Sequence, residues 1–154
     1  MRALQVAKYF ITLNKVANSD EPSDLSKLKI QKLLYYAQGY YLALYDKPLF
    51  DDEIQAWEHG PVVVSVFNEF KKIDDKFIPT DKYALSSDEI KNIGKEEKEL
   101  IEEVFDLMGQ YSAWKLREMT HSETPWLNTY KDNKKNVVIP KELIKSFFKN
   151  YVEL

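Results

Sequence analysis

The chain has 154 residues, and this length favours a single domain, residues 1–154, with a core of its own. Its net charge of −3 and its pI of about 5.5 lack the basic excess that is typical of nucleic-acid-binding domains. The absence of cysteine excludes disulfides, thiolate catalysis and cysteine-ligated zinc. Because the chain also has no recognisable signal peptide or membrane span, we expect a cytoplasmic protein.

Two segments in the first third of the chain have the apolar periodicity of helices. Residues 2–17 form the first, and residues 27–45 form the second, for which Ser26 is the predicted N-cap. The second helix is apolar over so much of its surface that we expect it to lie at the centre of the fold. Gly39 lies in its interior, where glycine weakens the helix but permits the close approach of another one.

The middle of the chain predicts short strands followed by a helix. Leu49-Phe50 and residues 53–57 alternate as two short strands would. Gly60-Pro61 comes next, and proline suits the first turn of a helix because its missing N–H has no helical acceptor there. We therefore expect a helix over residues 61–72.

The second half of the chain predicts a loop and several further helices. Residues 73–87 are expected to form a loop with at most one strand, and residues 137–139 a short extended segment. The predicted helices cover residues 88–93 after a cap at Ser86 or Ser87, residues 95–110, residues 112–119, and a last segment that opens at Pro140. The fold class is therefore mainly α: a single compact helical domain around a long central helix, with a small two- or three-stranded β element.

The only two histidines lie in similar stretches, His59 in AWEHGPVV and His121 in MTHSETPW. In the second stretch we favour Ser122 as a helix N-cap. Pro125 then falls in the first turn, where its missing N–H costs no hydrogen bond. A cap at Thr120 is the alternative, but it would place Pro125 where it removes a helical hydrogen bond.

No pattern of catalytic or cofactor-binding residues stands out. Neither His59 nor His121 has a second histidine at helical spacing, so no metal site is predicted. Ser122 adjoins His121 but lacks the setting of a catalytic nucleophile, and the glycines are too scattered for a phosphate-binding loop. The paired acidic residues are typical of a solvated surface. We predict no cofactor and no enzymatic activity.

The central helix carries five tyrosines that cover too many angles for all of them to be buried. We expect about half to belong to the core and the rest to form a binding surface, where tyrosine offers a large contact area with few rotamers. Stacking on nucleic-acid bases is a weaker alternative, because no basic groove accompanies them. The five are Tyr35, Tyr36, Tyr40, Tyr41 and Tyr45.

Two motifs carry a resemblance to a known family. LSKLKIQKLLYYAQGYYLALYDKPLFDDEIQAWEHGPVV resembles the signature of the Panacea antitoxin domain family, also described as SocA-like and as phage-associated GepA-like. REMTHSETPW is similar to the family's second motif, with Met119 in place of the usual leucine, and the resemblance covers about residues 5–130. The matching residues are Lys32, Leu33, Tyr35, Tyr36, Trp57, Gly60, Pro61, His121, Pro125 and Trp126.

The resemblance implies an antitoxin of a bacterial or phage two-gene system, which neutralises a cognate toxin encoded nearby by direct protein–protein binding. A nucleic-acid-binding regulator or a protease adaptor associated with a mobile element is the alternative, and homo-oligomerisation is left open. Neither a membrane nor nucleic acid is expected as a partner. The candidate partner-binding residues are Tyr35, Tyr36, Tyr40, Trp57, His59, His121 and Trp126, the last of which is expected to point toward the core.

The alternatives make separate demands on the surface. A nucleic-acid-binding regulator would need a continuous basic face. The lysines that could supply it are Lys71, Lys72 and Lys76, or Lys131, Lys134 and Lys135. An enzyme would need a pocket that joins one of the two histidines to an acid.

Overall fold

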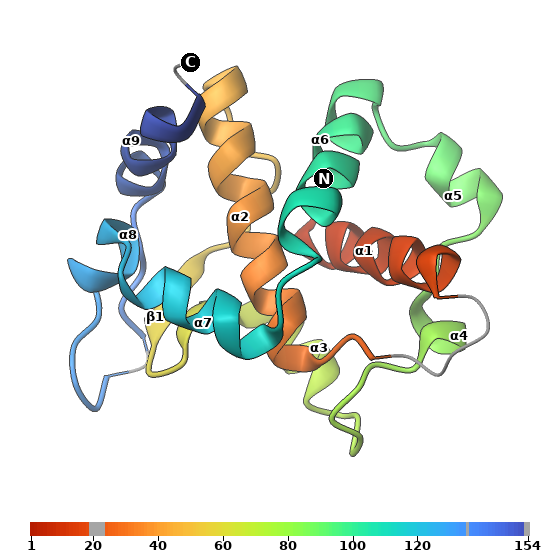
Figure 1. The fold of residues 1–154 in the computed structure, drawn as a ribbon, viewed down its shortest axis with the longest axis horizontal. Helices are drawn as coiled ribbons and strands as arrows, with labels where there is room; N and C mark the ends of the chain where they lie inside the picture. The colour runs from red at the N-terminus through yellow and green to blue at the C-terminus, as the bar shows by residue number, and fades with distance from the viewer. Residues whose placement is uncertain (19–23, 135, 153–154) are drawn as a thin grey trace.

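The computed structural model describes residues 1–18, 24–134 and 136–152 and shows a mainly helical fold around one long helix, as predicted (Figure 1). That helix, α2 (Lys27–Tyr45), begins after Ser26, whose side chain accepts a hydrogen bond from the backbone N–H of Lys29. The chain leaves the helix at Asp46, which has a positive φ of 58°. The predicted bounds and the Ser26 cap are both confirmed.

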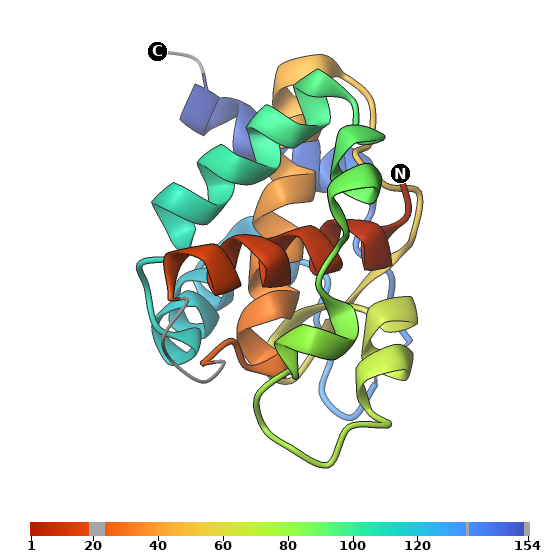
Figure 2. The same ribbon diagram turned by 90° about the vertical axis from the view of Figure 1, so that its right-hand side faces the viewer.

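Three helices enclose α2. Figure 1 shows α9 (Lys141–Val152) on one side of it and α6 (Lys95–Met108) on the other, and Figure 2 shows α1 (Ala3–Ala17) crossing it at a steep angle. Every residue of α2 from Ile30 to Gly39 is buried. A helix buried on all sides belongs at the centre of a fold, which confirms the sequence-based expectation.

Gly39 is the point at which α9 approaches α2 most closely. A Cβ atom at this position would lie 2.2 Å from ring carbons of Phe148, whose side chain is fully buried. Because no heavy atoms pack at that distance, any larger residue would displace the ring. The close helix approach expected at Gly39 is therefore confirmed.

The β element is a hairpin, and two predictions about it were wrong. Strand β1 (Ile54–Trp57) pairs antiparallel with β2 (Gly60–Val63), so the chain extends through Pro61 and α3 (Val64–Phe70) begins later than expected. Gly60 has a φ of 113°, which favours glycine and lets the chain turn back onto β1. Pro61 is tolerated because β2 is an edge strand whose outer side needs no donor.

The predicted strand at Leu49-Phe50 does not form, because a buried side chain takes the place of a neighbouring strand. The Gln38 side-chain oxygen accepts from both Leu49 and Phe50 backbone N–H groups, and its amide nitrogen donates to the Phe50 carbonyl. On the other edge of β1, the Ala56 N–H donates to the Val137 carbonyl. A bridge there confirms the extended segment at 137–139.

The remaining helices are short. They are α4 (Thr80–Tyr83), α5 (Ser87–Lys91), α7 (Ala113–His121) and α8 (Thr124–Leu127). Ser86 caps α5 and completes a capping box with Glu89. A loop was expected where α4 forms, and this helix is held in place by the buried ring of Tyr83 against Phe70, with ring centroids 5.0 Å apart. The sequence also predicts a helix break at residues 18–22 and a polar turn at residues 132–136, and both segments lie partly outside the described residues.

Candidate partner-binding site

The two histidine-containing stretches meet in space. Helices α7 and α8 pack beside the turn of the β1–β2 hairpin (Figure 1), and three of their side chains bond to it. Trp126 donates from its indole nitrogen to the Trp57 carbonyl at 2.7 Å, and His121 Nε2 lies 2.8 Å from the Glu58 carbonyl. Arg117 donates from Nε to His59 Nδ1 at 3.2 Å. We call Arg117, His121 and Trp126 the hairpin clamp.

Both ring nitrogens of His121 face backbone carbonyl oxygens in this clamp. Its Nδ1 lies 2.6 Å from the Arg117 carbonyl of its own helix, while its Nε2 faces the Glu58 carbonyl. Carbonyl oxygens accept, so either contact is a hydrogen bond when the ring nitrogen that faces it carries a hydrogen. The ring also packs on Trp126, with centroids 4.0 Å apart. His121 therefore fixes the hairpin turn.

The predicted N-cap at Ser122 was wrong. Helix α7 continues through His121, Ser122 follows as its C-cap, and the Ser122 hydroxyl donates to the Met119 carbonyl. Glu123 occupies the N-cap position of α8 without capping it, and Pro125 falls in the first turn, as expected. The reason is that the Glu123 side chain points inward and is held by two tyrosine hydroxyls.

Glu123 is a buried carboxyl that ties α2 to the α7–α8 junction. Its two oxygens accept hydrogen bonds from the hydroxyls of Tyr35, at 2.8 Å, and Tyr36, at 2.7 Å. Burial raises the pKa of Glu123 to about 7, although the two hydrogen bonds act in the opposite direction. The same burial, together with the nearby carboxylate, raises the pKa of both tyrosines.

Lys32 is a buried cation on the same side of α2 as Tyr35 and Tyr36, three and four residues before them in the helix. Its side chain has no exposed surface, and its Nζ donates to the Pro61 carbonyl at 3.2 Å. Burial, and secondarily the charge of Arg117, lowers the pKa of Lys32 to about 7. Gly60 packs against its stem, since a Cβ there would lie 2.8 Å from Lys32 Cε. Among the described residues, Lys32 forms no ion pair.

A groove opens beside Lys32, between the start of α2, the hairpin and α3. A cavity of about 370 Å³ shares the lining residues Lys27, Gln31 and Phe67 with a neighbouring cavity of about 220 Å³, and we call the two together the groove. Trp57 and Phe67 form part of its wall, with their rings 4.8 Å apart and edge to face. The groove residues are Lys27, Leu28, Gln31, Lys32, Trp57, Glu58, His59, Val62, Phe67, Phe70 and Lys71.

Comparison with known proteins places these features in one family. Residues 30–127, more than half of the chain, match the family model described as "Antitoxin SocA-like, Panacea domain". The chain belongs to this family. It is also similar to the protein named "Antitoxin SocA" of Caulobacter vibrioides (strain NA1000 / CB15N), with 33% identity over 125 residues, which cover 75% of this chain and 64% of that protein. The chain thus spans less than two thirds of that relative's length, and no solved structure matches it.

The Panacea match includes both histidine-containing stretches, the hairpin clamp, Glu123 with its two tyrosines, and the groove except for Lys27 and Leu28. These features lie far apart in the sequence and come together only through α2 and the hairpin. The part of the chain that defines the family is therefore also the part that builds the groove and supports it.

The structure separates the predicted site residues into two groups. Those that are buried cannot meet a partner without rearrangement, and they are Tyr35, Tyr36 and Trp126. Those that keep exposed surface are Tyr40, Trp57, His59 and His121. Among the five tyrosines of α2, Tyr41 is also buried and Tyr45 is exposed, in keeping with the expectation that about half belong to the core. Partner contact by any of them remains a prediction.

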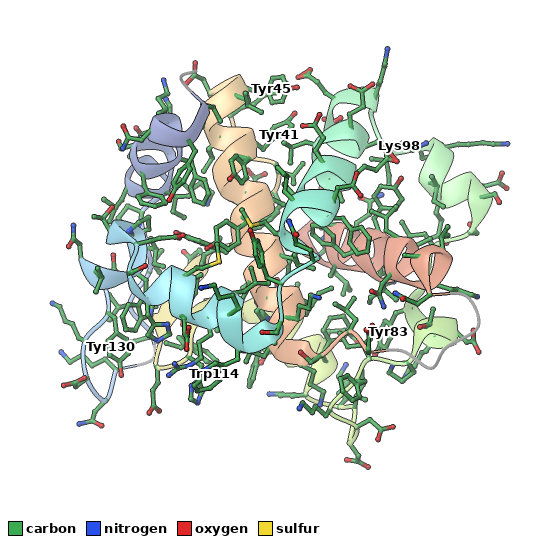
Figure 3. The ribbon with its side chains drawn as sticks, in the orientation of Figure 1. Tyr41, Tyr45, Tyr83, Lys98, Trp114 and Tyr130 are labelled. Carbon is green, nitrogen blue, oxygen red and sulfur yellow. The ribbon has the colours of Figure 1, made fainter. Side chains whose placement is uncertain are left out.

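Sequence reasoning missed several residues of this region. Lys32 was assigned to the family motif but not to a site, although a lysine among the apolar residues of a central helix is itself a signal. Arg117 and Glu123 carried no signal, because their partners are distant in sequence. Trp114 is 58% exposed, projects from α7 (Figure 3), and stacks on the Arg117 guanidinium at 4.5 Å.

The described residues hold no metal-binding group and no hydrogen bond between a histidine and a carboxylate. No group of three or more histidine, cysteine or acidic residues is placed to hold a metal ion within residues 1–18, 24–134 and 136–152. In the same ranges neither histidine bonds to a carboxylate, since His121 contacts carbonyl oxygens and His59 contacts Arg117. No helix there combines the length and apolar character that crossing a membrane requires.

Proposed function

We propose that this Panacea domain is an antitoxin that neutralises a cognate toxin, encoded nearby, by direct protein–protein binding in the cytoplasm. The observation that carries the proposal is the match of residues 30–127 to the antitoxin SocA-like family. The similarity to a protein named as an antitoxin over 75% of the chain supports it further. Neutralisation would be steric or conformational, with no cofactor and no catalytic step.

The surface around the hairpin is suited to protein binding. The groove is lined by His59, which bonds to Arg117, and Arg117 stacks on the exposed ring of Trp114. Tryptophan, tyrosine and arginine are the residues that most often dominate binding energy at protein interfaces. The hairpin clamp holds one wall of that groove in place before any partner arrives. Preorganisation of this kind lowers the entropic cost of association. An interface of ordinary size, about 1,600 Å² in total, would extend beyond the groove over the neighbouring helices.

The lysine clusters favour a protein partner over nucleic acid. Lys72 lies 3.8 Å from Glu69, and Lys134 lines the same surface depression as Glu58 and Asp132. Acidic groups beside these lysines oppose the approach of phosphates, whereas a face of mixed charge is common in protein interfaces. Lys135 lies outside the described residues.

Co-expression with the product of the neighbouring gene tests the proposal. That product expressed alone should arrest growth, co-expression with this protein should restore growth, and the two proteins should co-purify as a stable complex. A matched control replaces this protein with a destabilised variant that does not fold, which should rescue nothing. Growth arrest that persists although both proteins are folded and abundant would refute the antitoxin function.

A further inference from the structure

Lys32 has unused hydrogen-bonding capacity at the groove. A lysine ammonium carries three N–H donors, and within the described part of the chain Lys32 makes one hydrogen bond, to the carbonyl of Pro61. The positive charge of Arg117 acts against the charged form of Lys32. A buried ammonium without an anion is costly, and a methionine would occupy the same space without that cost. Packing therefore does not explain why a lysine stands here.

The groove beside Lys32 has a cationic bias that contrasts with the net charge of −3 of the whole chain. Lys27, Lys32 and Lys71 line it, against a single acidic residue, Glu58. Lys27 donates to the carbonyl of Ile73, a neutral partner, and forms no ion pair within the described residues. The groove is thus complementary to an anion.

The walls of the groove are apolar at the same time. Leu28, Val62 and the paired rings of Trp57 and Phe67 surround the position of Lys32. Such walls exclude strongly hydrated ions and instead accept a group that carries hydrocarbon next to its charge. Lysines next to apolar walls therefore favour a peptide that carries a carboxylate side chain with apolar residues beside that side chain.

The shape of the groove favours a segment that passes through it. Its two cavities lie next to each other along the first turns of α2, and the second is lined by Phe70 at the end of α3 and by Lys71. A chain terminus would need only the first cavity, whereas an internal segment fills both. Gly60 packs against the fully buried Lys32 stem, so the ammonium reaches a ligand by rotation of that flexible stem.

We propose that this groove binds an internal segment of the toxin in which an acidic side chain, flanked by apolar residues, places its carboxylate against Lys32. The flanking residues pack on Trp57 and Phe67, and the bond of Lys32 to Pro61 is kept. The identity of the partner rests on the proposed antitoxin function, but the chemistry of the groove does not. Lys32 is then the residue that makes recognition specific for a carboxylate.

A peptide titration tests the groove without any toxin. The probes are blocked pentapeptides with glutamate between two of the residues Phe, Leu and Trp, and matched peptides with glutamine in its place. In amide NMR spectra of the full chain, the glutamate peptides should shift the signals of Lys32, Trp57 and Val62 in a saturable way. The glutamine peptides should bind at least about tenfold more weakly. Equal binding of both series, or no groove shifts at about 10 mM peptide, overturns the proposal.

Two variants separate recognition from folding. Lys32→Met should fold, as judged by its NMR spectrum, and should lose the preference for glutamate. Leu28→Glu, at a half-buried position in the groove, should place a carboxylate of the chain's own beside Lys32 and weaken glutamate peptides at least about tenfold. A preference that survives both changes refutes the role of Lys32. The control is Lys98→Met on α6, away from the hairpin (Figure 3), which should bind as the wild type does.

The same variants in the co-expression assay distinguish the two proposals. If the toxin binds the wild type, Lys32→Met should weaken the complex at least about tenfold while Lys98→Met does not. Equal binding of all three would refute the groove and leave the antitoxin function standing. A neighbouring gene product that does not bind at all would refute the antitoxin function, while the peptide titration would still decide the groove.

Discussion

Replacement of Glu123 by glutamine should flatten the dependence of stability on pH below neutrality. The Glu123 side chain is buried, and burial raises its pKa from 4.5 to about 7. Between these two pH values the folded protein holds a proton that the unfolded chain has lost. The contribution of this group to stability is therefore fully present below pH 4.5 and is lost as the pH rises through 7.

The size of the effect follows from the shift. A pKa that is raised from 4.5 to about 7 corresponds to about 3 kcal/mol of free energy of unfolding between the two ends of that range. Glutamine cannot ionise, yet its amide can accept from one tyrosine hydroxyl and donate to the other. The variant should thus keep the fold and lose the pH dependence that Glu123 contributes.

Urea unfolding between about pH 5 and pH 8 measures this directly. The difference in free energy of unfolding between the wild type and Glu123→Gln should change by about 3 kcal/mol over that range, with the wild type relatively more stable at the acidic end. Glu118→Gln, at an exposed position of α7, is the control and should track the wild type. A difference between the wild type and Glu123→Gln that stays constant with pH would refute the reasoning.

Three further substitutions test the packing and the buried charge. Gly39→Ala should destabilise the protein by about 1–2 kcal/mol in thermal unfolding, because the added methyl collides with Phe148 and outweighs the gain in helix propensity; unchanged stability would contradict that close contact. Trp126→Phe keeps an aromatic ring but removes the donor to the Trp57 carbonyl, and should lower the free energy of unfolding in urea by about 1–2 kcal/mol. An unchanged free energy of unfolding would show that water replaces the lost hydrogen bond. The wild type should gain stability as the pH rises from about 7 toward 10, because folded Lys32 is then neutral and no charge is buried. Lys32→Met should lack this rise. Urea unfolding curves of the two proteins that stay parallel with pH would count against a lowered pKa of Lys32.

Local signals predicted the helices well. The bounds of α2, the cap at Ser26 and the capping box at Ser86 depend on residues within one turn of each other. Such contacts are visible in the sequence because they involve only nearby side chains and backbone groups. The same holds for the close approach at Gly39, which a glycine inside a helix already indicated, although not its partner Phe148.

Local signals misled where a distant partner competed for the same residues. Pro61 suits a helix start, but pairing with β1 and the left-handed turn at Gly60 kept this segment extended. Ser122 suits an N-cap, but α7 continues to His121 and Ser122 becomes its C-cap. Glu123, the residue after Ser122, takes the N-cap position of α8, and its side chain accepts hydrogen bonds from two buried tyrosine hydroxyls. In each case the long-range contact replaced the locally preferred one.

By itself the sequence determined the fold class, the central helix and the family, because periodicity, caps and motif spacing are properties of neighbouring residues. Only the tertiary structure decided that His59 and His121 belong to one braced hairpin, and that Glu123 is buried against two tyrosines. It also decided that Lys32 stands beside an apolar groove. Burial and charge pairing depend on groups brought together from positions dozens of residues apart, and no local pattern encodes which groups those are.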